Sequence, residues 1–410
     1  MHKKQLLDKI TNFYLDSRDW NGLPVSEDMP LHCVTSLISE GLVSLNRGDR
    51  HPNPHIKAFA PESSAEQIQK IKEEGLFGCL YPEPIHLSTV VDPKKLSDKP
   101  FTLRLTLGEP QLKFYSFDLT VLEYYRNDPR YRFHLDDIQG SISITDEHYD
   151  NQSMRPSDKI FLQSFGFSYD ENLNRAVAVF LRYLHDLSSE HQRVWETKIL
   201  DAVYKLHPDY AGSCTGHWHE RVSIFNAFVE ELHHINEMAK LMNRPALFRR
   251  TFREQERPKP FAFLLRPTAK EFQHFVQLLD KMLSDNINLG FFGSDVDRER
   301  EVTRPDGKVV MQPKGSIQIL DEWLNRIKFP DLKPRREMIT TFKSIRKQRS
   351  KPAHHVDDDR FDQAFFRKQR DLVIAAYTAV RTLRLILANH PNIRGYKVPN
   401  WLHEGKIWTR

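Results

Sequence analysis

The stretch Arg346-Lys-Gln-Arg349-Ser-Lys-Pro352-Ala-His354-His355 separates two segments in which apolar residues recur at helical spacing. The segment before it predicts an amphipathic helix from Arg336 to Gln348, and the segment after it, Phe361 to Asn389, is the longest helical pattern in the chain. Pro352 cannot continue a helix and drives the residue before it towards an extended conformation. The stretch is therefore predicted to be a turn that joins two helices.

Two further helices are expected before this pair. Thr268-Ala-Lys-Glu271 is a capping box, a sequence that opens a helix. After a charged insertion, Asp295 to Lys314, in which Pro305-Asp-Gly307 predicts a hairpin turn, another helix spans Ser316 to Ile327. Four amphipathic helices in succession predict a helical bundle over residues 266–410.

Arg349 and His354 have the chemistry that cleavage of RNA without a metal requires. A base must take the proton from a ribose 2′-OH, and histidine suits this role because its pKa lies near neutrality. A cation must stabilise the phosphate as it gains charge, and arginine is always charged and forked to match phosphate oxygens. Because side chains five residues apart diverge by about 140° on a straight helix, the break at Pro352 is needed to turn both into one cleft.

An Arg followed by four residues and a His, at the junction of the third and fourth helices of a bundle, resembles the motif of the HEPN superfamily. The resemblance covers roughly residues 268–391, and Arg349 and His354 match the Arg and the His of the family. It implies metal-independent ribonuclease activity, two chains that pair to form one composite cleft, and a role in toxin–antitoxin or antiphage defence, with an antitoxin or defence-system partner. Ser350 stands where members commonly carry Asn, Asp or His.

The expected site extends beyond this pair. Arg346, Ser350 and His355 are auxiliary candidates. Two basic clusters, at 242–260 and 333–351, are expected to hold the RNA backbone and to make the affinity depend on salt. The alternative is that Arg349 and Lys351 form a solvated basic face and that His354 packs against the following helix. The candidate RNA contacts are Arg249, Arg250, Arg253, Arg335, Arg336, Lys343, Lys347 and Lys351.

The N-terminal residues follow a different pattern. Two helical segments end at Gly41, and an apolar strand, a polar turn and a returning strand at His55 to Phe59 are expected after it. This order resembles a winged helix, which implies that the helix at His32 to Ser39 can enter a DNA groove while hairpin arginines touch phosphate. The alternative is a unit used for packing or protein contact. With its linker, the unit is expected to span residues 1–90.

Residues 91–265 predict a middle domain that combines helices with an antiparallel sheet of about four strands. The aromatic side chains of the sheet are expected to pack in its core rather than to stack on bases. A proline- and arginine-rich segment at 244–267 is the expected boundary with the bundle. The predicted strands lie at 102–107, 112–124, 131–135 and 141–144, and the predicted helices at 173–187, 194–206 and 217–242.

Composition is that of an ordinary soluble globular protein. The 410 residues are 39 % hydrophobic and 28 % charged, which excludes a disordered chain and predicts two or three domains. A net charge of +5 permits nucleic-acid binding without requiring it. No apolar run approaches the roughly 18 residues that span a bilayer, so no membrane association is expected. The three cysteines are far apart and odd in number, which favours a reducing compartment, the cytoplasm.

No cofactor or metal is expected. The chain has no glycine-rich phosphate loop, and Cys214, His217 and His219 lack the paired cysteine spacing of a zinc site. The expected fold is mainly α, with a winged-helix-like unit, a central α+β part and a HEPN-like four-helix bundle. The expected function is that of a metal-independent, homodimeric endoribonuclease. The alternatives are a DNA-binding regulator and a defence scaffold in which the bundle only dimerises.

Overall fold

The computed structural model describes residues 2–57, 61–135, 138–172, 174–213, 216–217, 221–253, 256–350 and 359–409. Helices and antiparallel sheets occur together, and helices predominate, as the sequence predicts. The chain divides into two compact units, Met1–His134 with Ile138–His219 and Leu135–Asp137 with Glu220–Arg410. The first contains most of the expected N-terminal and middle domains. The expected boundary segment, 244–267, lies inside the second.

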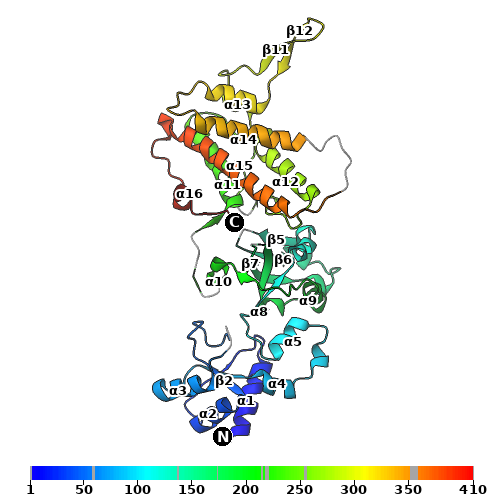
Figure 1. Ribbon diagram of the computed structural model, residues 1–410, viewed down its shortest axis with the longest axis vertical. Helices are drawn as coiled ribbons and strands as arrows, with labels where there is room; N and C mark the ends of the chain where they lie inside the picture. The colour runs from blue at the N-terminus through cyan, green and yellow to red at the C-terminus, as the bar shows by residue number, and fades with distance from the viewer. Residues whose placement is uncertain are drawn as a thin grey trace. The chain divides into compact units, whose positions relative to one another are not determined.

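The first 90 residues of the first unit form a three-stranded antiparallel sheet with helices packed on it (Figure 1). The strands lie in the order β1, β3, β2, and the core contains Leu6, Val34, Leu37 and Leu80. In chain order the elements are α1 (Lys3–Asp16), β1 (Leu23–Pro24), α2 (Leu31–Ser39), β2 (Val43–Asn46), α3 (Ser64–Glu74), β3 (Cys79–Pro82) and α4 (Pro84–Val90).

The strand that returns to β2 is not the one expected. We predicted it at His55 to Phe59, but residues 55–57 form no strand, and residues 58–60 lie outside the described part of the chain. β3 pairs with both β1 and β2 instead, although the prolines at 82 and 84 favour a linker over residues 80–84. Leu80 and Tyr81 are fully buried in β3. Because β3 is buried on both faces, its sequence does not alternate between apolar and polar residues, and the strand was not predicted.

A second antiparallel sheet, of six strands, completes the first unit. The strand order is β4, β8, β7, β6, β5, with β9 against β7. The predicted antiparallel type is confirmed, as are strands at β5 and β6, and Phe117, Tyr125 and Tyr131 lie in the core as expected. The elements are α5 (Pro100–Thr106), β4 (Phe114–Phe117), α6 (Glu123–Arg126), β5 (Tyr131–Leu135), β6 (Gln139–Ile144), α7 (Asp146–Tyr149), β7 (Phe161–Tyr169), β8 (Arg175–Phe180), α8 (Leu181–Leu184), α9 (Ser189–Glu196), β9 (Lys205–Leu206) and α10 (Pro208–Ser213).

Two predicted strands of this sheet are wrong in whole or in part. Residues 102–106 belong to helix α5, because Pro100 presets a helical first turn and the Gln192 side chain accepts hydrogen bonds from the backbone N–H groups of residues 101 and 102. The strand predicted at 112–124 ends at Phe117. There the Asp118 side chain accepts a hydrogen bond from the Thr120 N–H and turns the chain into a 3-10 helix.

The first part of the helix predicted at 173–187 is strand β8, and a single helical turn, α8 (Leu181–Leu184), follows it. β8 lies between β4 and β7, and five of its six residues are buried. A strand covered on both faces carries a continuous apolar run, which periodicity cannot distinguish from a buried helix. The helix predicted at 194–206 ends at Glu196, and the one predicted at 217–242 begins at Ile224.

The second unit is built around long helices. α11, α14 and α12 all pack against α15, which confirms the predicted helices at 268–286, 336–348 and 361–389 and adds α11 to them (Figure 1). Thr268 caps α12 by accepting a hydrogen bond from the Glu271 N–H, as the capping box predicts. The elements are α11 (Ile224–Leu241), α12 (Ala269–Met282), α13 (Ser316–Leu324), α14 (Lys333–Ser350), α15 (Ala364–Ala388) and α16 (Asn400–Glu404).

Short strands accompany these helices. The charged insertion forms the predicted hairpin, and its turn contains Gly307, at φ +81°. β10 (Val222–Ser223) pairs in parallel with β13 (Ile407–Trp408), and the hairpin strands are β11 (Glu299–Thr303) and β12 (Val309–Pro313). Across the described residues, no helix is both long enough and apolar enough to cross a membrane.

Candidate functional site

Arg349 lies at the C-terminal end of α14, where it meets two aspartates. Its Nη1 is 2.7 Å from Asp280 Oδ2, and it also forms an ion pair with Asp285. One turn earlier, Arg346 binds the same two carboxylates, with Nε 3.0 Å from Asp280 Oδ2 and Nη2 2.6 Å from Asp285 Oδ1. The predicted catalytic arginine and one auxiliary candidate are therefore joined by a shared pair of acids.

The two acids differ in burial. Asp280 is on α12 and is fully buried, whereas Asp285 is in the 3-10 helix η5 (Ser284–Asn286) and is 38 % exposed. A buried carboxylate loses its hydration, and the two arginines replace that hydration with charged hydrogen bonds. The hydrogen bonds to Asp280 and Asp285 in turn raise the pKa of Arg349 above its usual value. The arginines are fixed in orientation by an acid that solvent does not reach.

Arg249, from the first basic cluster, comes to the same place. Its Nη1 donates to the Asp285 carbonyl at 3.4 Å, and its backbone N–H donates to the Asn286 carbonyl at 2.8 Å. The Arg250 N–H donates to the Asn286 side chain at 2.9 Å. Arg249, Arg250 and Arg253 are exposed. The two basic clusters, about one hundred residues apart in sequence, therefore meet at η5.

The other predicted contacts on α14 have different surroundings. Arg335 is mostly buried and binds Asp321 of α13 at 2.5 Å, while Lys343 lies 3.5 Å from the same carboxylate and is 58 % exposed. Arg336 and Lys347 are exposed on the same helix. The Ser350 hydroxyl donates to the Arg346 carbonyl at 3.0 Å. Of these residues, Arg335 is the most buried, and its ion pair with Asp321 has a structural role.

His354, His355 and Lys351 lie outside the described residues, which end at 350 and resume at 359. Both flanks are bound to α12. The Gln273 side chain donates to the Arg349 carbonyl at 3.3 Å, and the Asp359 side chain accepts from the Lys270 N–H at 2.9 Å, which lowers the pKa of Asp359. Asp359 therefore binds the first turn of α12.

The sequence analysis missed Asp280 and Asp285. Asp280 carried a signal, because it lies among the apolar residues of α12 that face the core, next to Leu279 and four residues after Val276. An acid in that position must find a cation when the helix packs. Asp285, in a short exposed segment, carried no comparable signal.

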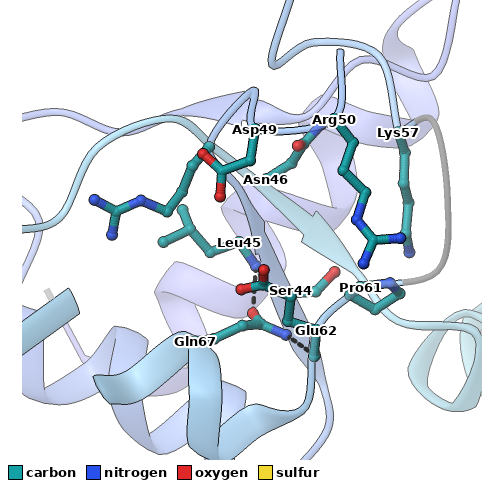
Figure 2. A pocket seen from close by; sticks show the side chains of 10 residues that line it. Ser44, Leu45, Asn46, Asp49, Arg50, Lys57, Pro61, Glu62 and Gln67 are labelled. Atoms are coloured by element: carbon teal, nitrogen blue, oxygen red, sulfur yellow. Dashed lines mark hydrogen bonds between the residues drawn. The ribbon is translucent and has the colours of Figure 1, made fainter. Parts of the chain in front are cut away.

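A pocket of about 570 Å³, including the open space in front of it, lies in the first unit between β2 and α3 (Figure 2). Gln67 forms part of its wall, accepting from the Leu45 N–H at 2.8 Å and donating to the Glu62 carbonyl. Arg50 and Lys57 extend side by side across it, and Lys57 also binds Glu83 at 3.0 Å. Both cations and acids line the pocket, so its charge identifies no ligand.

The same region bears on the expected DNA contact. α2, the helix that a winged helix would place in a groove, contains no Lys or Arg. Arg47, from the polar turn, binds Glu74 at 2.8 Å and lies over the Phe77 ring, and its side chain is only 4 % exposed. Of the two arginines of the polar turn, Arg50 is therefore the exposed one.

No metal site accompanies these clusters in the described part of the chain, where no group of three His, Cys, Asp or Glu side chains is arranged to hold an ion. Cys214 and His219 lie outside that part. Comparison of the chain with protein-family models, with curated proteins and with solved structures found no match.

Proposed function

We propose that the second unit is a metal-independent endoribonuclease of the HEPN type, active as a homodimer in a toxin or antiphage defence role. Arg349 binds the scissile phosphate, and His354 acts as the base. His354 takes the proton from the ribose 2′-OH, O2′ forms a bond to phosphorus, and the bond from phosphorus to O5′ breaks. The products are a 2′,3′-cyclic phosphate and a 5′-hydroxyl, whose oxygen takes its proton from solvent.

The observation that carries this proposal is the position of Arg349. Both of its described ion pairs use Nη1, and 34 % of its side-chain surface remains exposed. A guanidinium has five N–H donors, so a phosphate can approach the others while the acids hold the side chain in place. A cation that is already oriented loses little entropy when it binds the reacting group.

The surroundings supply a second support. Arg249 and Arg346 lie beside Arg349, and Lys347 is on the same helix. Three arginines around Asp280 and Asp285 leave a surplus of positive charge at the end of α14. A polyanion such as RNA is attracted to such a surplus, with an affinity that falls as salt rises.

The test is cleavage of total RNA by purified full-length protein in EDTA, followed by detection of 2′,3′-cyclic phosphate ends. We expect His354→Ala to lower the rate by about 10²–10⁴-fold, the usual contribution of a general base. His355→Ala is the matched control, the same change one residue away, and should retain most activity. Arg349→Lys keeps the charge near Asp280 while removing the forked donor, and should also lose most activity.

Melting temperatures equal to wild type make these results interpretable. Equal cleavage by wild type and His354→Ala would refute the proposal, because a contaminating nuclease would explain both.

A non-catalytic scaffold is the second candidate, and one observation favours it. Asp280 and Asp285 already engage Arg346 and Arg349, so the arginines have a structural role without any substrate. Under this alternative the wild-type protein does not cleave RNA under any condition, yet forms a dimer.

A further inference from the structure

The hairpin of β11 and β12 extends from the second unit beyond α13 (Figure 1). Its register pairs Glu299 with Pro313 and Thr303 with Val309. The ladder continues at both ends, because the Arg304 N–H donates to the Lys308 carbonyl and the Lys314 N–H to the Arg298 carbonyl, each at 2.8 Å. Positions 298 to 314 therefore form one two-stranded ribbon. Its even-numbered residues lie on one face and its odd-numbered residues on the other.

The two faces of this ribbon carry opposite charges. All of the ribbon's cations occupy even positions, and the acids of its strands, Glu299 and Glu301, occupy odd positions beside the exposed Val309 and Met311. Successive residues of a strand point to opposite faces, so the pleat collects the cations on one side. The cations are Arg298, Arg300, Arg304, Lys308 and Lys314.

The cations at the base of the ribbon are held by the protein, and those further out are exposed. Arg298 donates to the Leu289 carbonyl at 3.4 Å, and Lys314 binds Glu322 at 2.6 Å. Arg300, Arg304 and Lys308, which we call the cationic face, are exposed, and within the described residues none of them forms an ion pair with an acid. Arg300 donates only to Gln312, at 3.1 Å.

This arrangement has a cost for folding. Arg304 and Lys308 face each other across the ladder, and like charges directly opposite are destabilising. A two-stranded ribbon has little core to offset that cost, since Val302 and Val310 are the half-buried apolar pair on this face. An acid in place of either Arg304 or Lys308 would form an attractive pair with the cation opposite it. An external polyanion on the cationic face would relieve this repulsion.

We infer that the cationic face of the β11–β12 ribbon binds the phosphate backbone of RNA. Arg300 and Arg304 are four residues apart along the ribbon, about 13.6 Å at the usual rise of a strand, and Lys308 lies opposite Arg304 across the ladder. The three cations can therefore contact successive phosphates of a chain that lies along this face. The choice of RNA over DNA rests on the proposed function, while the phosphate contact rests on the ribbon alone. The ribbon would hold RNA without taking part in the cleavage chemistry.

The test uses full-length protein in the His354→Ala background and EDTA, so that binding is measured without cleavage. Fluorescence anisotropy with a labelled 20-nucleotide RNA compares two triple variants that lower net charge equally. Arg300→Gln/Arg304→Gln/Lys308→Gln removes three charges from the cationic face, and Thr303→Glu/Val309→Glu/Met311→Glu adds three opposite charges to the other face.

We expect the first variant to weaken binding at least about tenfold and to reduce the slope of log affinity against log salt by about 2, because three phosphate contacts are lost. The second should change affinity much less and leave the slope as in wild type. Equal effects of both variants, or none from the first, would overturn the inference, and an acidic protein partner would then fit the ribbon better. Equal binding of the same-sequence DNA would retain the phosphate contact but reject selectivity for RNA. Loss of catalysis by the proposed site would leave these results unchanged, so the two proposals fail separately.

Discussion

Asp280 is the residue on which the candidate site depends structurally. It is fully buried, and both Arg346 and Arg349 bind it. We predict that Asp280→Asn lowers the free energy of unfolding by about 1–3 kcal/mol, less than for a completely buried pair because both arginines are partly exposed. Asp285→Asn removes the same charge from the same arginines at an exposed position, and should cost under about 1 kcal/mol. Urea unfolding measures both, and equal losses would show that burial is not the deciding factor.

A second residue-scale prediction concerns His191. The Trp195 Nε1–H donates to the Tyr125 hydroxyl at 2.9 Å, so that hydroxyl is left to donate to His191 Nδ1, 2.8 Å away. This chain requires a neutral histidine, and burial lowers the pKa of His191 below its usual 6.5. As pH falls through 6.5, the unfolded state therefore binds a proton that the folded state does not, and stability falls.

We expect His191→Gln, which accepts the same hydrogen bond without titrating, to lack this contribution. The free energy of opening of α9, measured by hydrogen exchange between pH 7.5 and 5, should fall more steeply in wild type than in the variant. Parallel curves would show that His191 does not titrate in this range, and would refute the assignment of a neutral, buried imidazole.

At the scale of elements, α12 depends on its cap. The Thr268 hydroxyl accepts from the Glu271 N–H, and Glu271 in turn accepts from the Leu265 N–H at 3.2 Å. We predict that Thr268→Ala destabilises the second unit by about 1 kcal/mol. Thr340→Ala, the same change on the exposed side of α14, should be neutral or slightly stabilising, because alanine favours helix. Thermal unfolding distinguishes the two, and an unchanged melting temperature for Thr268→Ala would mean that the cap contributes nothing.

Elements differ in how well local patterns predict them. α12, α13, α14 and α15 each present one apolar stripe to a core and water to the other side, so their period appears in the sequence. β8 has no such exposed side, and α5 depends on Gln192, which is about ninety residues away. Local periodicity therefore predicts half-exposed elements and fails where distant segments cover both faces or supply the cap.

At the scale of the whole molecule, the proposed composite site makes a prediction about mixed dimers. If Arg349 of one chain acts with His354 of the other, mixing the inactive Arg349→Lys and His354→Ala proteins should restore part of the cleavage in EDTA. Each variant alone should remain inactive at the same total concentration. No recovery after verified subunit exchange would place both groups within one chain, or exclude the site.

The sequence by itself determined helices α12 to α15, the cap at Thr268, the hairpin turn at Gly307 and the parity that sorts the charges of the ribbon. These depend on interactions between residues close together in the chain. Only the tertiary structure decided that β3 completes the N-terminal sheet, and that Arg249 and Arg349 meet at η5 around Asp280 and Asp285. Pairing between distant segments depends on which surfaces are buried together, and that choice leaves no period in the sequence.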